Sequence, residues 1–148
     1  MKVELKIDEK LNETKITISA PSLNEDVKKV NDLLNNSFIL NNKMNVFLER
    51  EMFLINLSDI ETIYSSNNKV YVKANNNLYT TKYKLYELEE MLCNSTFVRI
   101  SNSEIVNFDK VEKLNLKLTG TILLFFKSGS ETYVSRRYIK KIKEYLNL

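Results

Sequence analysis

Short polar and basic segments border strand-like runs in the last third of this 148-residue chain. Ser101-Asn102-Ser103 follows the run 97–100, and Arg136-Arg137 follows Val134-Ser135. Arginine can pair bidentately with guanine O6 and N7, and each such pair contributes about 1–3 kcal/mol of discrimination between bases. Two arginines at the start of an expected helix also cost about 0.3–1 kcal/mol beside the positive end of its dipole, unless an external anion is bound. The pattern favours nucleic-acid contact through loops.

The positive charge is concentrated in the second half of the chain. Residues 75–148 hold 12 basic and 8 acidic side chains, a net of +4, whereas residues 1–74 hold 10 and 11, a net of −1. The segment 136–143 carries five basic residues and no acidic one, a density that attracts phosphates. A helix face that is simply solvated would explain the same charges, so both interpretations stay open here.

The composition argues against catalysis. Histidine is absent, which removes the side chain most used for acid–base work near neutral pH and the commonest metal ligand. Gly120 and Gly129 fall in expected hairpin turns, so no glycine-rich loop can cradle a nucleotide phosphate. Glu89 and Glu90 are adjacent on an expected helix and point about 100° apart, which is unsuited to paired carboxylate chemistry. We expect neither an enzyme nor a cofactor.

The N-terminus alternates charged and apolar residues and lacks the features of a secretory signal. No apolar run approaches the roughly 20 residues that a membrane helix needs. These features predict a cytoplasmic protein that does not span a membrane. The single cysteine, Cys93, ends an expected helix and is predicted to be buried, with a reactive thiol as the alternative.

Residues 1–42 are predicted to form a small β-β-α extension. Segments 2–7 and 14–19 alternate apolar and polar residues as strands do. Ser22, with Glu25 three residues later, resembles a capping box for a helix that ends near Asn35-Asn36. So small a unit buries little surface alone, and its apolar stripe should pack on the main domain or on a second copy. We favour dimerisation.

Residues 43–148 are predicted to form a domain that is mainly β with short helices, of the α+β class. The segment 122–126 is apolar at every position and should be covered on both faces, which predicts a sandwich rather than an open sheet. Asn75-Asn76-Asn77 suits a tight turn because asparagine tolerates positive φ. Amphipathic helices are expected over 83–93 and 136–148. Strands are expected over 45–50, 52–57, 60–65, 69–74, 78–81, 96–100, 111–118, 121–127 and 131–135.

Several polar residues are predicted to serve the fold. Tyr71, Tyr79, Tyr83 and Tyr86 are expected to pack in the core or across strands rather than stack on unpaired bases. Asn107 is likewise expected to be structural.

From about Asn45 to Leu146 the sequence resembles a LytTR-type DNA-binding domain, the elongated β-sandwich module of bacterial response regulators and small stand-alone transcription factors. Residues 1–42 resemble the N-terminal extension of stand-alone members, and no receiver domain is recognised. The motifs that carry the resemblance are Tyr83-Lys84-Leu85-Tyr86-Glu87-Leu88-Glu89-Glu90, Phe97-Val98-Arg99-Ile100-Ser101-Asn102-Ser103, Ile105-Val106-Asn107 with Lys110-Val111, and Val134-Ser135-Arg136-Arg137-Tyr138-Ile139-Lys140.

The resemblance implies that loops between strands enter successive major grooves. Asn102 and Arg137 match base-contacting positions of the family, and the loop 65–69 matches a third contact region. Family members that place a histidine in this loop differ from this chain, and Lys69 or Asn68 is assigned there instead. Phosphate contacts, which orient a protein without reading sequence, are assigned to Arg99, Ser103, Ser135, Arg136, Lys82, Lys84 and Lys140.

The sequence therefore predicts a sequence-specific transcription regulator that binds double-stranded DNA, as a homodimer on paired half-sites. The resemblance also implies a membrane-protein antagonist encoded nearby, because stand-alone relatives are often encoded beside one. The alternative is a dimerisation or protein-interaction adaptor that has kept the fold and lost its DNA affinity.

Overall fold

The computed structural model describes residues 2–35, 42–93 and 95–148. The chain divides into two compact units, Met1–Asn36 and Ser37–Leu148, which are treated separately below. In the described residues no helix is long and apolar enough to cross a membrane.

The N-terminal unit contains one helix, α1, over Glu25–Asn35. The backbone N–H of Val27 donates to Oδ1 of Asn24 at 2.9 Å, so Asn24 caps the helix. The sequence prediction of Ser22 as the cap was two residues early, whereas the predicted end of the helix is confirmed.

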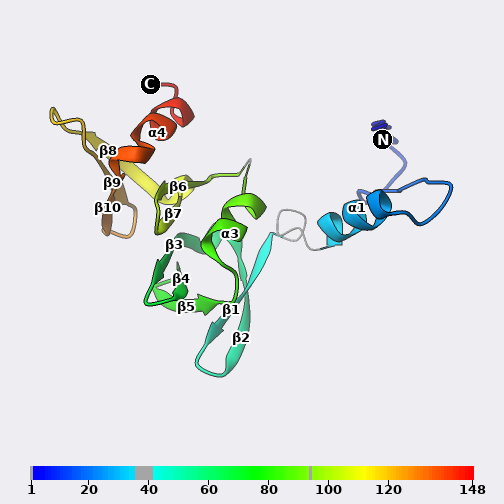
Figure 1. The fold of residues 1–148 in the computed structure, drawn as a ribbon, viewed down its shortest axis with the longest axis horizontal. Coiled ribbons are helices and arrows are strands. Elements are labelled where there is room, and N and C mark those ends of the chain that lie inside the picture. Colours follow the sequence, from blue (N-terminus) through cyan, green and yellow to red (C-terminus); the bar gives the residue numbers. More distant parts are fainter. Residues whose placement is uncertain (1, 36–41, 94) are drawn as a thin grey trace. The chain divides into compact units, whose positions relative to one another are not determined.

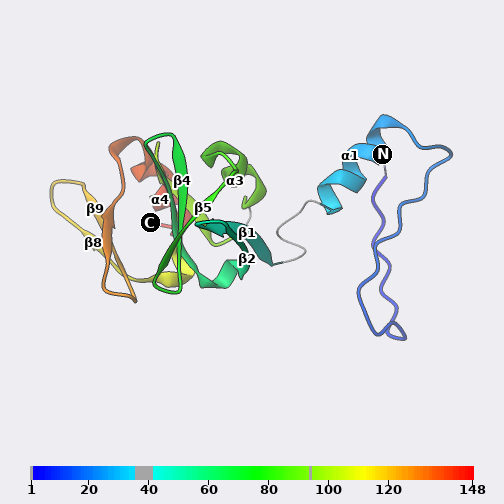
Figure 2. The same cartoon turned by 90° about the horizontal axis from the view of Figure 1, so that it is seen from below.

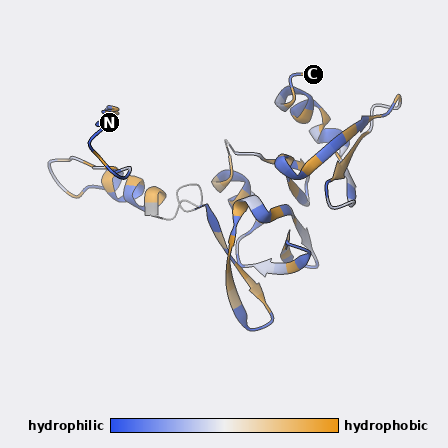
Figure 3. Cartoon of the chain, turned by 180° about the vertical axis from the view of Figure 1, so that it is seen from behind, coloured by the Kyte–Doolittle hydropathy of each residue, from blue (hydrophilic) through white to orange (hydrophobic). Residues whose placement is uncertain are grey.

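The two strands expected before α1 are not formed: the described residues 2–24 contain no strand. A turn does occur between them, where the backbone N–H groups of Lys10 and Leu11 donate to Asp8. Val3, Leu5 and Ile7 are 82–87% exposed. A lone two-stranded hairpin is marginal in water, and without a covering layer the alternating pattern has nothing to pack against. Figure 3 shows hydrophobic residues along the segment before α1 and along α1 itself.

The second unit is built on a seven-stranded antiparallel sheet with the order β2-β1-β5-β4-β3-β7-β6 (Figure 1). Strand β7 was not expected as a separate element from the sequence. The strands are β1 (Lys43–Leu48), β2 (Glu51–Asn56), β3 (Ile60–Ser66), β4 (Lys69–Ala74), β5 (Asn77–Thr81), β6 (Phe97–Ser101) and β7 (Glu104–Asn107).

Two asparagine pairs make tight turns in this sheet. Asn75 and Asn76 have φ of 50° and 62° and connect β4 to β5, as the sequence predicted. Asn67 and Asn68 have φ of 49° and 60° and connect β3 to β4. Two consecutive positive φ angles match the right-handed twist of a hairpin, and asparagine accepts them with little strain.

A three-stranded sheet follows, with the order β10-β9-β8. Its strands are β8 (Val111–Leu116), β9 (Ile122–Phe126) and β10 (Glu131–Tyr133). Gly120 and Gly129 lie in its connections at φ of 84° and 92°, which agrees with the predicted turns.

Short helices cover these sheets (Figure 2). Helix α3 spans Leu85–Met91, and the Glu87 carboxylate accepts the backbone N–H of Lys84 at 2.8 Å before its first turn. The C-terminal segment is a 3-10 turn, η3, over Arg136–Tyr138, followed by α4 over Ile139–Tyr145. Both helices are shorter than predicted. Two further 3-10 turns are η1 (Leu57–Asp59) and η2 (Phe108–Lys110).

The hairpin β6–β7 contributes to two hydrophobic cores. Phe97 and Ile105 pack in the core under α3, with residues of β1 to β5. Val98, Ile100 and Val106 point to the other face and pack with β9 and α4. The loop between β6 and β7 is therefore anchored at its base by buried residues on both sides.

The predictions for individual polar residues gave mixed results. Tyr64 and Tyr71 stack across β3 and β4 at 5.3 Å, and Tyr79 is buried against Phe53 at 5.6 Å. Tyr86 is instead 57% exposed. Cys93 is also exposed, so its predicted burial was wrong. Leu88 of α3 and Leu92, which directly follows the helix, are buried, and the next residue lies at the surface.

Asn107 is structural, as predicted. Its side chain is buried, its Nδ2 donates to the Ile60 carbonyl at 2.9 Å, and its Oδ1 accepts from Thr96 Oγ1 and the Asp109 N–H. Its hydrogen bonds therefore fix β7 to the start of β3 and to η2.

Candidate nucleic-acid interface

Backbone hydrogen bonds bring three of the predicted contact segments together. The N–H of Ser65 donates to the Ser103 carbonyl at 2.8 Å, which joins the end of β3 to the β6–β7 loop. The N–H of Ser135 donates to the Ile100 carbonyl at 2.9 Å, which joins the segment before η3 to the end of β6. The β6–β7 loop thus lies between the β3–β4 turn and the arginine-bearing turn η3.

The middle segment presents Asn102 and Ser103, which are both exposed. The loop is shaped locally, because the backbone N–H of Ser103 donates to Oγ of Ser101 at 3.2 Å. The hydroxyl of Tyr138, at the end of η3, donates to Oδ1 of Asn102 at 3.1 Å. An asparagine amide held in this way retains N–H donors and an acceptor lone pair, which together suit bidentate pairing with adenine.

Arg99 supports this loop from below. Its Nε donates to the Ser101 carbonyl at 3.0 Å, and its Nη2 donates to the Asn102 carbonyl at 2.6 Å. Its Nη1 lies 3.3 Å from Oε2 of Glu89 on α3. The guanidinium is thus bonded to protein acceptors, and the Arg99 side chain is only 16% exposed.

Arg136 and Arg137 are exposed in the turn η3, and Ser135, which precedes them, is half-buried. The Tyr138 N–H donates to the Ser135 carbonyl at 2.9 Å and closes this turn. Lys140 follows on the exposed side of α4. The segment therefore carries three cations at the surface.

The other outer segment is the β3–β4 turn. Asn68 is exposed at its tip, and Lys69, also exposed, is paired with Ser66 across the hairpin. Register places Lys82 at the same end of the sheet, one position beyond the Val70–Thr81 pair of β4 and β5. Lys82 Nζ lies 5.2 Å from the centroid of the Phe47 ring, and Lys84 immediately precedes α3.

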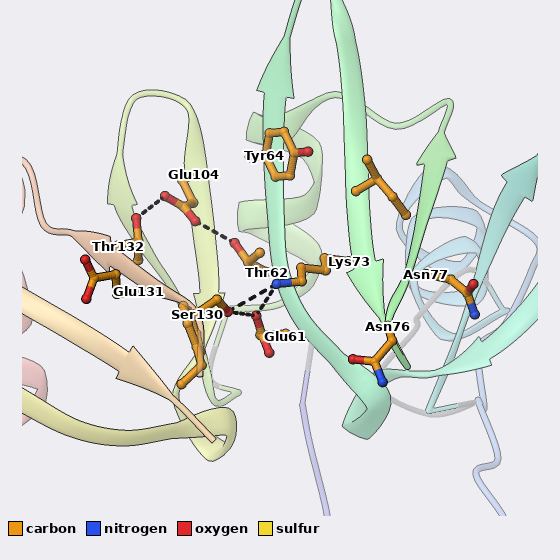
Figure 4. A pocket seen from close by; sticks show the side chains of 12 residues that line it. Glu61, Thr62, Tyr64, Lys73, Asn76, Asn77, Glu104, Ser130, Glu131 and Thr132 are labelled. Carbon is orange, nitrogen blue, oxygen red and sulfur yellow. Dashed lines mark hydrogen bonds and ion pairs between the residues drawn. The ribbon is translucent and has the colours of Figure 1, made fainter. Parts of the chain in front are cut away.

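Two carboxylates lie behind these segments, between the large and small sheets (Figure 4). Glu104 accepts from Thr62 Oγ1 on β3 and from Thr132 Oγ1 on β10, each at 2.8 Å. Glu61 lies 3.0 Å from Lys73 Nζ and accepts from Ser130 Oγ at 2.6 Å. Both carboxylates therefore connect the two sheets.

The environment of Glu61 favours its charged form. Burial alone would raise the pKa of Glu61, but hydrogen bonds from Ser128, Ser130 and Lys73, together with the charge of Lys73, outweigh that effect. The pKa of this carboxyl consequently lies below its ordinary value.

The sequence did not point to Tyr138, Glu104 or Thr132 as contributors to this surface. Tyr138 belongs to a motif that carries the family resemblance. Its place directly after two arginines was a signal that could have indicated its role at this surface. Glu104 and Thr132 carried no signal, because their contact depends on the packing of two sheets that are far apart along the chain.

The second unit is a β-sheet module whose joined loops carry exposed amide and basic side chains, which are groups that can contact nucleic acids. Residues 50–147 match the LytTr DNA-binding domain, and the chain belongs to this family. It is a DNA-binding regulator.

Its relatives agree with that assignment. Two Staphylococcus aureus proteins, from strains MSSA476 and NCTC 8325, are 39% and 38% identical over 152 residues, covering 100% of this chain and 99% of each relative. Both are named HTH-type transcriptional regulators. The LytTr DNA-binding domain of a Bacillus cereus protein has the same fold, with a TM-score of 0.69 and 24% identity over 72% of this chain and 98% of that domain.

The relatives' names refer to a helix-turn-helix, but α3 and α4 of this chain are not consecutive. Strands β6 to β10 separate them. These two helices therefore do not form a helix-turn-helix.

Proposed function

We propose that this protein reads double-stranded DNA through the major groove with three adjacent loops. Asn102 and Arg137 are the proposed base contacts, and Asn68 or Lys69 supplies a third. The observation that carries the proposal is the pair of backbone bonds, Ser65 to Ser103 and Ser135 to Ile100, which brings the three loops into one row. Amide and guanidinium groups are the side chains best suited to adenine and guanine edges.

Phosphate contacts would flank these loops. Ser103, Ser135 and Arg136 are near neighbours of the proposed base contacts along the chain. Lys82 lies at the end of the sheet that carries the β3–β4 turn, Lys84 directly precedes α3, and Lys140 lies on α4. Such contacts set orientation and supply salt-dependent affinity. Arg99 is reassigned from phosphate contact to support of the loop, because its three donor groups bond to Glu89 and to two loop carbonyls.

The regulator would act as a homodimer on paired half-sites. Leu23 and Leu33 of the N-terminal unit are 73% and 71% exposed, and the segment before α1 exposes further apolar residues. Burial of this surface against a second copy would remove the apolar area from water. The resulting dimer would bring two DNA-binding units to one duplex. A regulator of this kind would work in the cytoplasm, where bacterial DNA lies.

The second candidate is a protein-interaction adaptor without DNA affinity. The exposed apolar residues of the N-terminal unit favour it, because patches of this kind mark sites of protein association. It differs from the first proposal in predicting no preference among duplexes.

The test is selection of bound duplexes from a random library by the full chain, followed by titration at near-physiological salt. A specific regulator should enrich a paired motif and bind it at least about 10³-fold more tightly than scrambled duplex. A folded sample that enriches no motif would contradict sequence-specific reading and would favour the adaptor.

A further inference from the structure

The Glu104 carboxylate joins three strands that lead to the three proposed reading loops. Glu104 itself lies on β7, directly after Ser103. Thr62, which donates to one of its oxygens at 2.8 Å, lies on β3, four residues before Ser66. Thr132, which donates to the other oxygen at 2.8 Å, lies on β10, four residues before Arg136. Figure 4 shows the carboxylate between the two threonines.

This contact is one of the side-chain links between the large sheet and β10, the strand that leads into η3. Strands β3 and β7 pair directly, with Thr62 opposite Val106, so their spacing is fixed by the backbone ladder. Strand β10 pairs with β9 of the small sheet. In the described residues β10 forms no backbone ladder with β7. Besides the backbone bond from Ser135 to Ile100, its placement therefore depends on side chains, and Glu104 provides one of these bonds.

We propose that Glu104 is a positioning residue for sequence readout: it holds the arginine-bearing turn in register with the β6–β7 loop and the β3–β4 turn. This inference rests on the proposed reading of DNA by these loops. Glu104 touches no base in the proposal, and it acts through the strands that its two hydrogen bonds connect.

The direction of the change in DNA affinity distinguishes a positioning role of Glu104 from simple charge repulsion. A carboxylate next to a DNA-binding surface repels phosphates, so its removal alone should strengthen binding to every duplex. If Glu104 positions the loops, its removal should weaken binding to the preferred duplex while binding to scrambled duplex is kept or strengthened. Phosphate contacts tolerate small shifts of a loop, whereas bidentate base pairing does not.

Glu61 provides an independent connection between the sheets, which should keep the fold intact when Glu104 is changed. Its carboxylate binds Lys73 of β4 and Ser130, which precedes β10. A substitution of Glu104 alone should therefore disturb the relative positions of the three loops, while Glu61 still connects the two sheets.

The experiment compares Glu104→Leu, Glu104→Gln and Thr132→Val with the full-length wild-type chain. Each protein is titrated with the duplex that the wild type selects and with a scrambled duplex of the same length. Glu131→Gln is the matched control, because it removes the same charge from an exposed position of β10 next to Thr132. Thermal melts check that each variant is folded.

We expect Glu104→Leu to reduce the ratio of selected to scrambled affinity by about tenfold, since two hydrogen bonds are lost. Thr132→Val should give a similar loss. The variant that combines Glu104→Leu with Thr132→Val should lose little more of the ratio than either single change. Glu104→Gln should keep most of the ratio, because threonine hydroxyls can rotate to pair with an amide. Glu131→Gln should leave the ratio unchanged and raise both affinities slightly.

The inference is overturned if Glu104→Leu raises both affinities together, as Glu131→Gln does. It is equally overturned if Thr132→Val, which removes one hydroxyl and retains the shape, leaves the ratio unchanged. A wild-type chain with no preference between duplexes is a different result, because it refutes the proposed reading of DNA itself.

Discussion

The phenolic hydroxyl of Tyr138 donates to Oδ1 of Asn102 across 3.1 Å, although the two residues are 36 positions apart. Tyr138 closes the turn that carries Arg136 and Arg137, and Asn102 stands at the tip of the β6–β7 loop. Two of the three proposed reading segments are consequently joined through their own side chains. A substitution in one of these two segments should therefore alter the DNA contacts of the other.

Tyr138→Phe should therefore reduce sequence preference while leaving the fold intact. The substitution removes one hydrogen bond of about 0.5–1.5 kcal/mol and frees the Asn102 amide to rotate, so preference should fall by roughly twofold to tenfold. Competition between selected and scrambled duplex measures the change. Tyr145→Phe is the control, because Tyr145 lies on α4 with its ring against Phe108. Equal preference in wild type and Tyr138→Phe would contradict the coupling.

Arg137→Ala should abolish discrimination at one base position. Loss of a bidentate guanine pair costs about 1–3 kcal/mol, so the preferred duplex should bind about tenfold or more weakly while scrambled duplex changes less. Repeating the duplex selection with the variant measures this directly. An unchanged selected motif would show that Arg137 does not read a base.

Lys84→Ala is the matched comparison for Arg137→Ala. As a proposed phosphate contact, Lys84 should contribute to all duplexes alike, and its removal should lower the slope of log affinity against log salt by about one. The selected motif should stay the same. A change of motif in this variant would indicate that Lys84 has another role.

Glu61 should make the stability of the protein depend on acid pH. Because the folded pKa of Glu61 is lowered, its contribution is present above the unfolded pKa of about 4.3 and is lost as pH falls through the folded pKa. Glu61→Gln should unfold about 1–3 kcal/mol more easily than wild type at pH 7, since bonds to a charged acceptor are lost. Urea unfolding should show this difference shrinking as pH falls below about 4. A difference that stays constant with pH would contradict this account.

Leu33→Asp should shift the proposed dimer toward monomer. Leu33 is exposed on α1, and a carboxylate buried there in an interface between copies would be strongly destabilising. Sedimentation of the full chain at micromolar concentration measures the mass. Asn31→Asp adds the same charge on the same helix at another exposed position and should leave the dimer intact. A wild-type chain that sediments as a monomer would contradict the proposed dimer.

Local features of the second unit were predictable because they depend on nearby residues. Asn75-Asn76 makes the turn that its tolerance of positive φ predicts, and Gly120 and Gly129 occupy turns as expected. The apolar run of β9 is mostly buried, as its composition indicated. The order of strands in the large sheet was not predictable, because β7 inserts between β3 and β6 and was not recognised as a strand.

The N-terminal unit illustrates the opposite case. Its alternating segments have the pattern of strands, yet residues 2–24 contain none. Alternation specifies a strand only when a neighbouring strand and a covering layer supply hydrogen bonds and buried surface. The helix α1 needed neither, since its hydrogen bonds lie within the segment and Asn24 caps it.

The class of the second unit, its turns and most of its strands could be predicted from the sequence, and the resemblance to a family predicted Asn102 and Arg137 as base contacts. The contacts around these residues depend on tertiary packing. It bonded Arg99 beneath the loop instead of leaving it at the surface, and it placed Glu104 between Thr62 and Thr132. Turns and strands follow from local backbone preferences, whereas these contacts depend on sheet register and on the packing of segments distant in the chain.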